Sequence, residues 1–557
     1  MNLEAGSKKN WEHKHPLKVM IAQLRSTLGE LSENAKRAIK AVKYAEQNNI
    51  DLLIFPELFI SGYYSRDWFL SPLLFEKEQE WLNRVFSYAD NTTIIIGSML
   101  ESGKKRKYNG ATVFSPLGFK EGIPKHYLPY DNVFYEARFF ETPEDKYKPS
   151  LNLYDWNIAV AICEDMWRES KVLASHFSSS PDLLVIINAS PFTENKFKER
   201  LELTRSHATF MNSYVVYANI WGGQEEVIFD GQSFILSPNG TLLIKAKPFK
   251  SEYLTIELPI NKSANSLNNN SSSIYRTDPD EILFHALRVS LQSYLRETPF
   301  DKVVVGLSGG IDSALVATIA TLSIGPKRVK AVFMPSRYTS KLSYEGVNKL
   351  VKNLGIDLDV IDIEPILKTV AITLNASEND GIAFQNLQSR IRGMVLMYYA
   401  NKYHALVLNT GNKSELAVGY MTLYGDAIGA WSILGDIFKT RVYDLARYVN
   451  RIKPGIIPEI IINRPPSAEL ANNQKDEDDL MPYYKLDHYL QEVIPFDKIV
   501  GPEDKEKLWV RRKLVQNEFK RRQIPPLPTI SRANLGVGRM SPMSIKYLQE
   551  LFEEIKE

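Results

Sequence analysis

The stretch Val303-Val304-Val305-Gly306-Leu307-Ser308-Gly309-Gly310-Ile311-Asp312-Ser313-Ala314 decides the fold of the second half of this chain. Its apolar, β-branched beginning is typical of a buried strand, and the residues from Ala314 to Thr321 have helical character. Between strand and helix, Gly309 and Gly310 let a ligand approach the backbone without meeting a Cβ. A glycine-rich turn that leads into a helix presents N–H groups and a positive helix end to an anion. The stretch therefore predicts a phosphate-binding loop.

The polar side chains of this loop refine the prediction. Ser308 and Ser313 add hydroxyl donors, whereas Asp312 requires a cation between its carboxylate and a phosphate, and Mg²⁺ fits that role. No lysine follows the glycines, so this is not the usual P-loop. The loop resembles the pyrophosphate-binding loop of the ATP pyrophosphatase superfamily, whose members split ATP into AMP and pyrophosphate. This resemblance implies ATP contacts from Gly306, Leu307, Ser308, Gly309, Gly310, Ile311, Asp312 and Ser313. A glycine-rich β–α turn without a ligand is the alternative.

Length and composition describe an ordinary globular protein. The 557 residues are too many for one core, so we expect two to four domains. A net charge of +2 gives no electrostatic reason to expect nucleic acid or an anionic membrane as a partner. No apolar run reaches the 18 residues of a membrane span, and the polar residues 1–16 are expected to be a flexible tail. The single cysteine excludes an intrachain disulfide, and a reducing cytoplasm is the expected setting.

Hydrophobic periodicity divides the chain into two α/β parts. The first, residues 17–260, has candidate helices at Ser32–Gln47 and Lys196–Met211, and candidate strands at Lys18–Leu24, Asp51–Phe55, Thr93–Ser98, Asn157–Ile162, Leu183–Ile187 and Tyr214–Ala218. A polar tract at 261–275 is typical of a linker. In the second part, residues 276–557, helices alternate with candidate strands at Lys302–Gly306, Val329–Met334, Asp357–Ile361 and Ala405–Asn409. This alternation predicts βαβ units and a doubly wound parallel sheet.

Three residues of the first part carry candidate chemistry. Cys163 comes directly after a buried-looking strand, where α/β proteins place active sites, although a lone cysteine is more often a small core side chain. Glu57 ends the apolar run Leu52–Pro56, so its carboxylate is paired, neutral or functional unless it turns to water. Lys125, in Ile123-Pro124-Lys125-His126, is by itself typical of a surface lysine.

Taken together, these segments resemble the Glu-Lys-Cys triad of the nitrilase superfamily, which implies an αββα sandwich over residues 17–260. In that resemblance Cys163 is the nucleophile, Glu57 the general base, and Lys125 stabilises the oxyanion. Glu136, 11 residues past Lys125, matches a second carboxylate that orients the lysine. The glutaminase members imply glutamine contacts from Glu164 and Ser190.

One position departs from the amidotransferase pattern. Relatives often have Leu-Pro-Asn-Tyr after the lysine, whereas this chain has Leu128-Pro129-Tyr130-Asp131. The glutamine-facing tyrosine of the family therefore falls on Asp131, which affects the expected glutamine contacts and leaves the triad intact.

The second part resembles the NAD⁺ synthetase family over nearly all of residues 275–557, which implies a fold of the adenine nucleotide alpha hydrolase type. The resemblance rests on an ordered series of segments: Asn409–Glu415, Val418–Asp426, Phe438–Thr440, Pro466–Leu470 and Asn472–Asp478. It implies an ATP contact from Thr410 and deamido-NAD⁺ contacts from Asn386, Glu415 and Lys520. Glu415 adds a second carboxylate that can hold Mg²⁺ with Asp312, and Lys439 can counter phosphate charge.

Two of these segments also have ordinary explanations. Lys520, within Lys520-Arg521-Arg522, is also compatible with a solvated basic helix face. The acidic run Lys475–Asp479 is typical of a solvated loop.

These resemblances imply a two-site ligase of NAD biosynthesis. ATP adenylates deamido-NAD⁺, ammonia released from L-glutamine attacks, and NAD⁺, AMP, pyrophosphate and glutamate are the products. The family also implies a homo-oligomer that binds neither nucleic acid nor membrane. One alternative is another ATP-pyrophosphatase amidotransferase, such as GMP or asparagine synthetase, but their glutaminases use an N-terminal or glycine-flanked cysteine that Cys163 does not match. The other is a non-catalytic nucleotide-binding protein with a degenerate amidase, although all five key residues are present: Glu57, Lys125, Cys163, Asp312 and Glu415.

Overall fold

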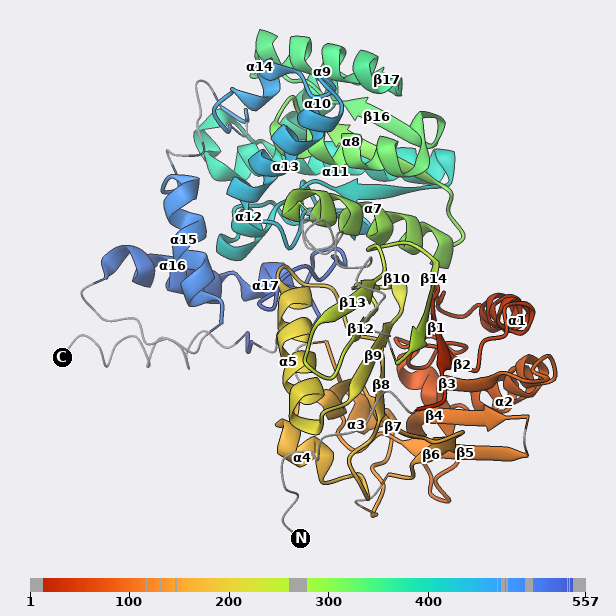
Figure 1. The fold of residues 1–557 in the computed structure, drawn as a ribbon. Coiled ribbons are helices and arrows are strands. Elements are labelled where there is room, and N and C mark those ends of the chain that lie inside the picture. The colour runs from red at the N-terminus through yellow and green to blue at the C-terminus, as the bar shows by residue number, and fades with distance from the viewer. Residues whose placement is uncertain are drawn as a thin grey trace. The chain divides into compact units, whose positions relative to one another are not determined.

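The computed structural model of this protein contains two compact units, Met1–Ile282 and Leu283–Glu557 (Figure 1). It describes residues 14–116, 118–130, 133–145, 148–259, 278–467, 469–471, 476, 479–495, 504–537, 539 and 541–543. The predicted linker at 261–275 and the departing position Asp131 lie outside these described residues.

Two six-stranded sheets form the first unit. One has the order β14-β1-β2-β3-β4-β5, with β1 Leu17–Gln23, β2 Leu52–Ile54, β3 Thr93–Leu100, β4 Tyr108–Ser115, β5 Phe119–Pro124 and β14 Glu252–Leu258. The other has the order β13-β12-β9-β8-β7-β6, with β6 Leu151–Leu153, β7 Trp156–Ile162, β8 Leu183–Asn188, β9 Tyr214–Asn219, β12 Phe234–Leu236 and β13 Leu242–Lys245. The strands β1–β3 are parallel, and so are β7–β9. A separate ribbon pairs β10 Trp221–Gln224 with β11 Val227–Asp230.

Helices cover the outer face of each sheet. On β1, Val19 and Ile21 join the core between the sheets, whereas Met20 and Ala22 pack with α1, as the two-residue period of a strand requires. That outer layer consists of α1 Leu31–Gln47 and α2 Pro72–Phe86, and the opposite one of α4 Ser170–Ala174 and α5 Lys196–Met211 (Figure 1). Short helices η2 Arg66–Leu70, α3 Glu136–Phe139 and η3 Cys163–Trp167 lie near the strand ends. The predicted αββα sandwich is confirmed.

The second unit is built on a five-stranded, fully parallel sheet in the order β17-β16-β15-β18-β19. Its strands are β15 Lys302–Leu307, β16 Val329–Phe333, β17 Asp357–Val360, β18 Ala405–Asn409 and β19 Trp431–Ser432. The chain adds β16 and β17 on one side of β15 and then returns to add β18 on the other side. The strand order therefore reverses between β15 and β18, the point at which such sheets bind ligands.

Both faces of this sheet carry helices, as predicted for a doubly wound fold. On one face α10 Glu364–Leu374 and α11 Ile382–Tyr403 bury their apolar sides against Val304, Val332 and Val407. Helix α8 Ile311–Ile324 contacts β15 and β16 and packs on α13 Lys439–Ile452. The remaining helices are α7 Pro279–Glu297, η5 Pro326–Arg328, α9 Lys341–Leu354, η6 Glu378–Asp380, α12 Lys413–Val418, α14 Glu459–Ile462, α15 Tyr483–Val493, α16 Lys505–Gln516 and α17 Glu518–Arg521.

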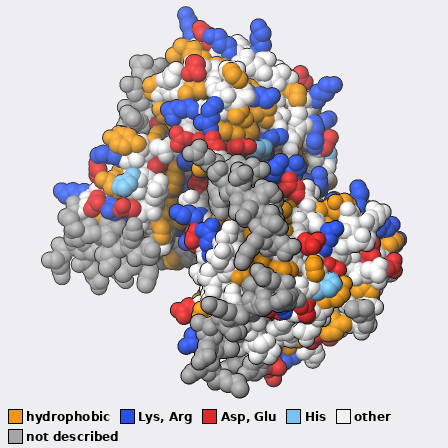
Figure 2. Space-filling model, in the orientation of Figure 1, with side chains coloured by type: hydrophobic (Ala, Val, Ile, Leu, Met, Phe, Trp, Pro, Cys, Tyr) orange, Lys and Arg blue, Asp and Glu red, His pale blue; other side chains and the backbone are white. Residues whose placement is uncertain are grey.

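The surface and the N-terminal residues add three facts. Figure 2 shows basic and acidic side chains interspersed over the surface in view, in keeping with the small net charge. Across the described ranges, no helix is both long and apolar enough to cross a membrane. Lys14, which we predict to belong to a flexible tail, instead forms an ion pair with Asp182 at 2.7 Å.

A buried carboxyl group on α2 makes the first unit sensitive to pH. Glu78 is fully buried, and the Met99 amide donates to its Oε2 at 2.8 Å. Burial raises the pKa of Glu78 from 4.5 to about 7, although hydrogen bonds from Met99 and Ser61 oppose the rise. A carboxyl with a raised pKa stabilises the fold below its unfolded pKa, and that contribution is lost as pH rises from 4.5 through 7.

We predict that Glu78→Gln stabilises the first unit at pH 8 by up to about 3 kcal/mol and has little effect at pH 5, because glutamine never ionises. Thermal unfolding of the variant and the unchanged protein at both pH values measures this difference. Glu80→Gln, on the exposed side of the same helix, is the matched control and should show no such pH dependence. A Glu78→Gln effect of equal size at both pH values would contradict the prediction.

Candidate active sites

Cys163 occupies a sharp turn at the carboxyl end of β7. Its φ of 43° lies in the left-handed region, which residues other than glycine rarely adopt. In other α/β enzymes, a strained turn between a strand and a helix carries the nucleophile at the edge of the sheet. Burial and the nearby Glu57 raise the pKa of the Cys163 thiol well above its ordinary range, although Lys125 opposes the rise. The thiol therefore needs a base to take its proton before it can attack a substrate.

Glu57, just past β2, is a base in a suitable place. Its fully buried carboxylate accepts three hydrogen bonds: from Asn109 Nδ2 at 2.7 Å, Lys125 Nζ at 2.7 Å and the Ala189 amide at 2.8 Å. Ala189 follows β8, so this bond joins the strand ends of the two sheets. Gly97 on β3 leaves room for this arrangement, since a Cβ there would lie 2.3 Å from the Glu57 Cα.

Lys125, at the end of β5, lies between two carboxylates. Its fully buried Nζ contacts Oε1 of Glu57 and Oε1 of Glu136, both at 2.7 Å. Burial by itself would lower the pKa of Lys125, but Glu136 and Glu57 raise it well above its ordinary value. Tyr63 donates its hydroxyl hydrogen to Glu136, whose own pKa is raised by burial. The structure thus brings a cation, a base and a thiol together.

Of the two residues expected to contact glutamine, Ser190 is the more firmly held. Its hydroxyl oxygen accepts from Arg200 Nε at 3.1 Å, and Arg200 is itself buried and paired with Asp230 at 2.7 Å. Glu164 is partly exposed and forms an ion pair with Arg168 at 3.1 Å. Sequence reasoning did not identify Arg200 or Asp230, because a charged residue within a helix or strand carries no local sign of burial.

In the second unit, the glycine-rich loop has the conformation that its sequence predicts. Gly309 has a φ of 82°, and a Cβ there would lie 2.7 Å from the Ser343 Cα, so only glycine fits. Ser308 Oγ accepts from the Gly310 amide at 3.2 Å, and Ser313 Oγ donates to the Gly310 carbonyl at 3.2 Å. The loop leads directly into α8, so the positive, N-terminal end of the α8 dipole points at the loop.

Three charged residues meet beside this loop. Asp312 follows β15 and Glu415 lies on α12 after the neighbouring β18, and Lys439 Nζ contacts both carboxylates, Glu415 at 3.1 Å. Asn412 Nδ2 donates to Asp312 at 2.9 Å. Burial raises the pKa of Glu415 to about 7, with Asp312 adding to the rise and Lys439 opposing it. Burial by itself would lower the pKa of Lys439, but Asp312 and Glu415 raise it above its ordinary value.

The donor set suits a magnesium ion that is brought with a nucleotide. Asp312 and Glu415 supply hard oxygen ligands, and Mg²⁺ commonly takes one or two carboxylates and completes its shell with phosphate and water. Among the residues that the structure describes, no cluster of three or more histidine, cysteine, aspartate or glutamate side chains could hold a metal ion. Two carboxylates leave the rest of an octahedral shell to water and phosphate, so the arrangement fits an ion that is held jointly with a nucleotide.

Two further predicted residues converge on the segment that follows α12. Lys520 Nζ donates to the carbonyls of Gly419 and Met421 at 2.7 and 2.8 Å, so its alternative explanation as a solvated basic face is wrong. Asn386, on α11, accepts from Thr422 Oγ1 at 2.7 Å. Thr410 lies one residue past β18, at the same sheet edge as the glycine-rich loop.

In the acidic run Lys475–Asp479, the described Asp479 is exposed, as expected for a solvated loop, whereas Asp476 is not. Asp476, one of its two described members, is buried and accepts from the Tyr483 hydroxyl at 3.1 Å. Tyr483 also donates to Glu415 at 3.3 Å. Asp476 therefore does not belong to a solvated loop, because it is buried and its carboxylate accepts a hydrogen bond from a tyrosine of α15.

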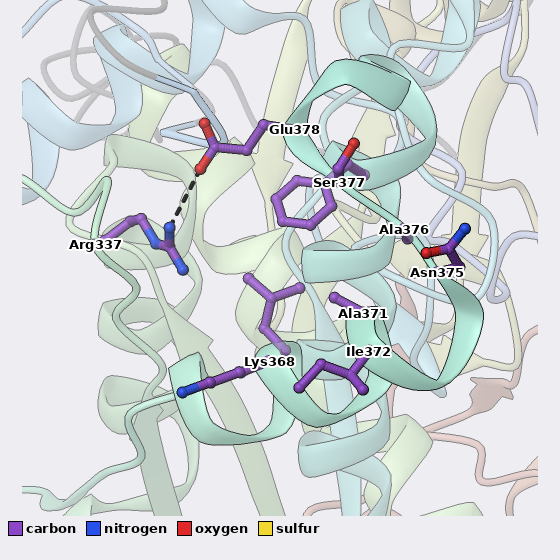
Figure 3. A pocket seen from close by; sticks show the side chains of 10 residues that line it. Arg337, Lys368, Ala371, Ile372, Asn375, Ala376, Ser377 and Glu378 are labelled. Atoms are coloured by element: carbon purple, nitrogen blue, oxygen red, sulfur yellow. Dashed lines mark hydrogen bonds and ion pairs between the residues drawn. The ribbon is translucent and has the colours of Figure 1, made fainter.

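A separate cavity of about 490 Å³ lies between α10, η6 and the start of α11 (Figure 3). Arg337 on its rim forms ion pairs with Glu364 at 2.7 Å and Glu378 at 3.2 Å. Lys368 and the apolar Phe384 also line it. None of the site residues predicted from the sequence lines this cavity.

Two family models match the chain, in order and side by side. The carbon-nitrogen hydrolase model matches residues 18–265, and the NAD synthase model matches residues 283–524. The chain is 35% identical to the glutamine-dependent NAD(+) synthetase of Aquifex aeolicus, across 96% of this chain and 100% of that protein. It is 34% identical to the enzyme of the same name from Thermotoga maritima, with the same coverage.

Solved structures agree with these matches. The glutamine-dependent NAD+ synthetase of Acinetobacter baumannii, solved with ADP, superposes with a TM-score of 0.73 at 30% identity, covering 95% of this chain and 98% of that one. The Cytophaga hutchinsonii structure superposes with a TM-score of 0.81 at 20% identity, covering 97% and 100%, and supports the fold alone. Since relatives about 35% identical span nearly the whole chain, it belongs to the family of glutamine-dependent NAD(+) synthetases, which are ligases.

Proposed function

We propose that this chain converts deamido-NAD⁺ to NAD⁺ with ATP, and that it obtains the ammonia by hydrolysing L-glutamine at Cys163. The observation that carries the proposal is the buried ammonium of Lys125, held at 2.7 Å from Glu57 and from Glu136 beside a strained cysteine. A second, separate charged centre around Asp312 supports the synthetase half.

At the first site, the Cys163 sulfur attacks the side-chain amide carbon of glutamine while Glu57 takes the thiol proton. The carbonyl oxygen becomes an oxyanion, which the Lys125 ammonium stabilises in a site that excludes water. When the C–N bond breaks, the proton passes from Glu57 to the leaving nitrogen, and ammonia departs from a thioester. Glu57 then removes a proton from water, which attacks the thioester and releases glutamate and the free thiol.

We assign the recognition of glutamine to Glu164 and Ser190. Ser190 is held by the buried Arg200, so its hydroxyl has a fixed position at the end of β8. Glu164 is partly exposed, and its carboxylate suits the α-ammonium group of glutamine.

At the second site, a nicotinate carboxylate oxygen attacks the α-phosphorus of ATP and pyrophosphate leaves. Ammonia then attacks the acyl carbon of the adenylate, and AMP leaves as NAD⁺ forms. We assign the triphosphate to the loop Gly306–Ser313 together with Thr410, and deamido-NAD⁺ to Asn386, Glu415 and Lys520. Asp312 and Glu415 would hold Mg²⁺, which neutralises phosphate charge when it is bound. Lys439, between the two carboxylates, keeps them apart and offers a second cation to the phosphates.

Cys163→Ala tests the first site. Glutamine hydrolysis should fall by at least about 10⁴-fold, because no thioester can form. Synthesis of NAD⁺ from added ammonium chloride should stay near that of the unchanged protein, because the adenylate forms in the other unit. Both rates are measured on one preparation by glutamate release and by NAD⁺ formation.

Glu57→Gln and Lys125→Met should also lower glutamine hydrolysis and leave ammonia-driven synthesis near that of the unchanged protein. Combining either with Cys163→Ala should cause little further loss of hydrolysis, because the three residues act as one unit. Full glutamine-driven synthesis by Cys163→Ala would refute the glutaminase assignment. Loss of ammonia-driven synthesis in a folded Cys163→Ala protein would refute the independence of the two sites.

Asp312→Asn tests the second site. Synthesis from both glutamine and ammonia should fall by about 10²-fold or more, because charge neutralisation by a metal is worth several kcal/mol, while glutamine hydrolysis persists. Asp301→Asn, at the exposed opposite end of β15, is the matched control. The unchanged protein should release AMP and pyrophosphate; release of ADP and phosphate, or full synthesis by Asp312→Asn, would contradict the assignment.

We also propose that the chain forms a homo-oligomer through α10 and α11. These two helices pack together, yet both leave large apolar side chains exposed. On α11 these are Met394, Met397 and Tyr398, and on α10 they are Ile372 and Leu374. Ile372 also lines the cavity of Figure 3, so a second copy seated on this surface would close that cavity. Exposed apolar surface of this kind marks association sites.

Light scattering of the purified protein should give a multiple of the chain mass. Met394→Asp should lower that multiple, because it places a charge in the apolar contact. Leu73→Asp, which changes an equally exposed apolar residue of the first unit, should leave the mass unchanged. A monomeric unchanged protein, or an unaffected Met394→Asp variant, would argue against this surface.

A further inference from the structure

A second buried ion pair lies against the backbone segments that carry Cys163 and Lys125. Asp165, in η3 two residues past Cys163, is fully buried and pairs with the equally buried Lys148 at 2.8 Å. Burial by itself would raise the pKa of Asp165, but Lys148 and the backbone amides of Ile162 and Tyr127 lower it below its ordinary value. Burial lowers the pKa of Lys148, although Asp165 opposes the shift.

The amide partners of Asp165 come from two different segments. Its Oδ2 accepts from the Ile162 amide at 3.0 Å, directly before Cys163. Its Oδ1 accepts from the amides of His126 and Tyr127, each at 3.0 Å, directly after Lys125. One carboxylate therefore connects the backbone beside the cysteine with the backbone beside the lysine.

Lys148 completes the connection on the other side of Lys125. Its Nζ donates to the Pro124 carbonyl at 2.9 Å as well as to Asp165. Its own amide donates to the His176 carbonyl at 2.8 Å, which anchors the backbone of Lys148 to the residues after α4. The ion pair thus holds the peptides on both sides of Lys125 and the peptide before Cys163.

We propose that the Asp165–Lys148 pair positions Lys125 against Cys163 for glutamine hydrolysis. The proposal rests on the proposed glutaminase function, and it makes both members positioning residues, since neither touches the reacting atoms. A buried pair that bridges two loops costs desolvation energy, which its hydrogen bonds offset. The same bonds fix how far the Lys125 ammonium lies from the Cys163 sulfur, and hence from the oxyanion that forms when the sulfur attacks. Oxyanion stabilisation depends steeply on that distance, because it acts in a dry site.

Two consequences separate this role from general support of the fold. Lys125 stabilises the oxyanion only after the attack, so its displacement should lower kcat for glutamine hydrolysis and leave KM nearly unchanged. Lys125 is also the group that lowers the pKa of the Cys163 thiol against Glu57, Glu136 and Glu164, which raise it. Displacing Lys125 should therefore move the reactivity of the thiol to higher pH.

The test uses the full-length protein with Asp165→Asn and Lys148→Met. Asp165→Asn keeps the volume of the side chain but removes its charge. Lys148→Met keeps the length of the side chain and leaves in place the three hydrogen bonds that backbone amides donate to Asp165. For each we expect kcat for glutamine hydrolysis to fall about 10²-fold with KM within about twofold, in line with the cost of a small misplacement. The half-maximal pH for Cys163 alkylation by iodoacetamide should rise by about half a unit or more. The double variant should lose little more than either single one.

Controls keep the outcome decisive. Lys14→Met removes another ion pair of the same unit, that with Asp182, and should change neither kcat nor the alkylation profile. Ammonia-driven synthesis should be unchanged in every variant. A normal kcat, an effect confined to KM, an unshifted alkylation profile, or a loss seen only in variants that are unfolded at the assay temperature would overturn the proposal. Failure of the unchanged protein to hydrolyse glutamine would instead refute the proposed function.

Discussion

A buried lysine ammonium held between two carboxylates organises the charged centre of each unit. In the first unit Lys125 lies between Glu57 and Glu136, and in the second Lys439 lies between Asp312 and Glu415. Burying an ion is costly unless partners replace its water, so each lysine fixes the segments that supply its carboxylates: α3 and the residues just past β2 in the first unit, and α8 and α12 in the second. Each centre carries one more carboxylate than ammonium. In the second unit burial raises the pKa of Glu415 to about 7 and Asp312 adds to the rise, and the excess negative charge favours the arrival of a further cation.

Sheet topology explains why these groups meet. The carboxyl ends of adjacent parallel strands lie at one edge of a sheet, so residues far apart in the chain become neighbours there. Asp312 follows β15 and Glu415 follows β18, the two strands between which the strand order reverses. In the first unit Glu57 follows β2 in one sheet and Ala189 follows β8 in the other, and a 2.8 Å hydrogen bond joins them. The candidate active site of this unit therefore lies where the strand ends of the two sheets meet.

Local backbone geometry is unusual at the same places. Cys163 has a φ of 43° and Gly309 a φ of 82°. The glycine adopts this conformation without cost, whereas the cysteine does so only because its surroundings hold it there. The bond from the Ile162 amide to Asp165 is one such constraint, since it fixes the peptide that enters the turn. The strained turn at Cys163 and the buried Asp165–Lys148 pair are therefore directly connected through the Ile162 amide.

The sequence by itself determined the two α/β parts and the type of chemistry. Periodicity located α5 and β18 at their observed bounds, and the glycine-rich loop, Cys163 and the carboxylates after apolar runs marked both sites. Strands β4 and β5 were not predicted, because Asn109 and Gly110 interrupt the apolar pattern of β4, and charged residues and a glycine interrupt that of β5. Only the tertiary structure decided the partners of these groups. Asn109 reaches Glu57 across 52 positions and Lys520 reaches Gly419 across 101. Such contacts depend on burial and strand order, and no local pattern around Asn109 or Lys148 encodes them.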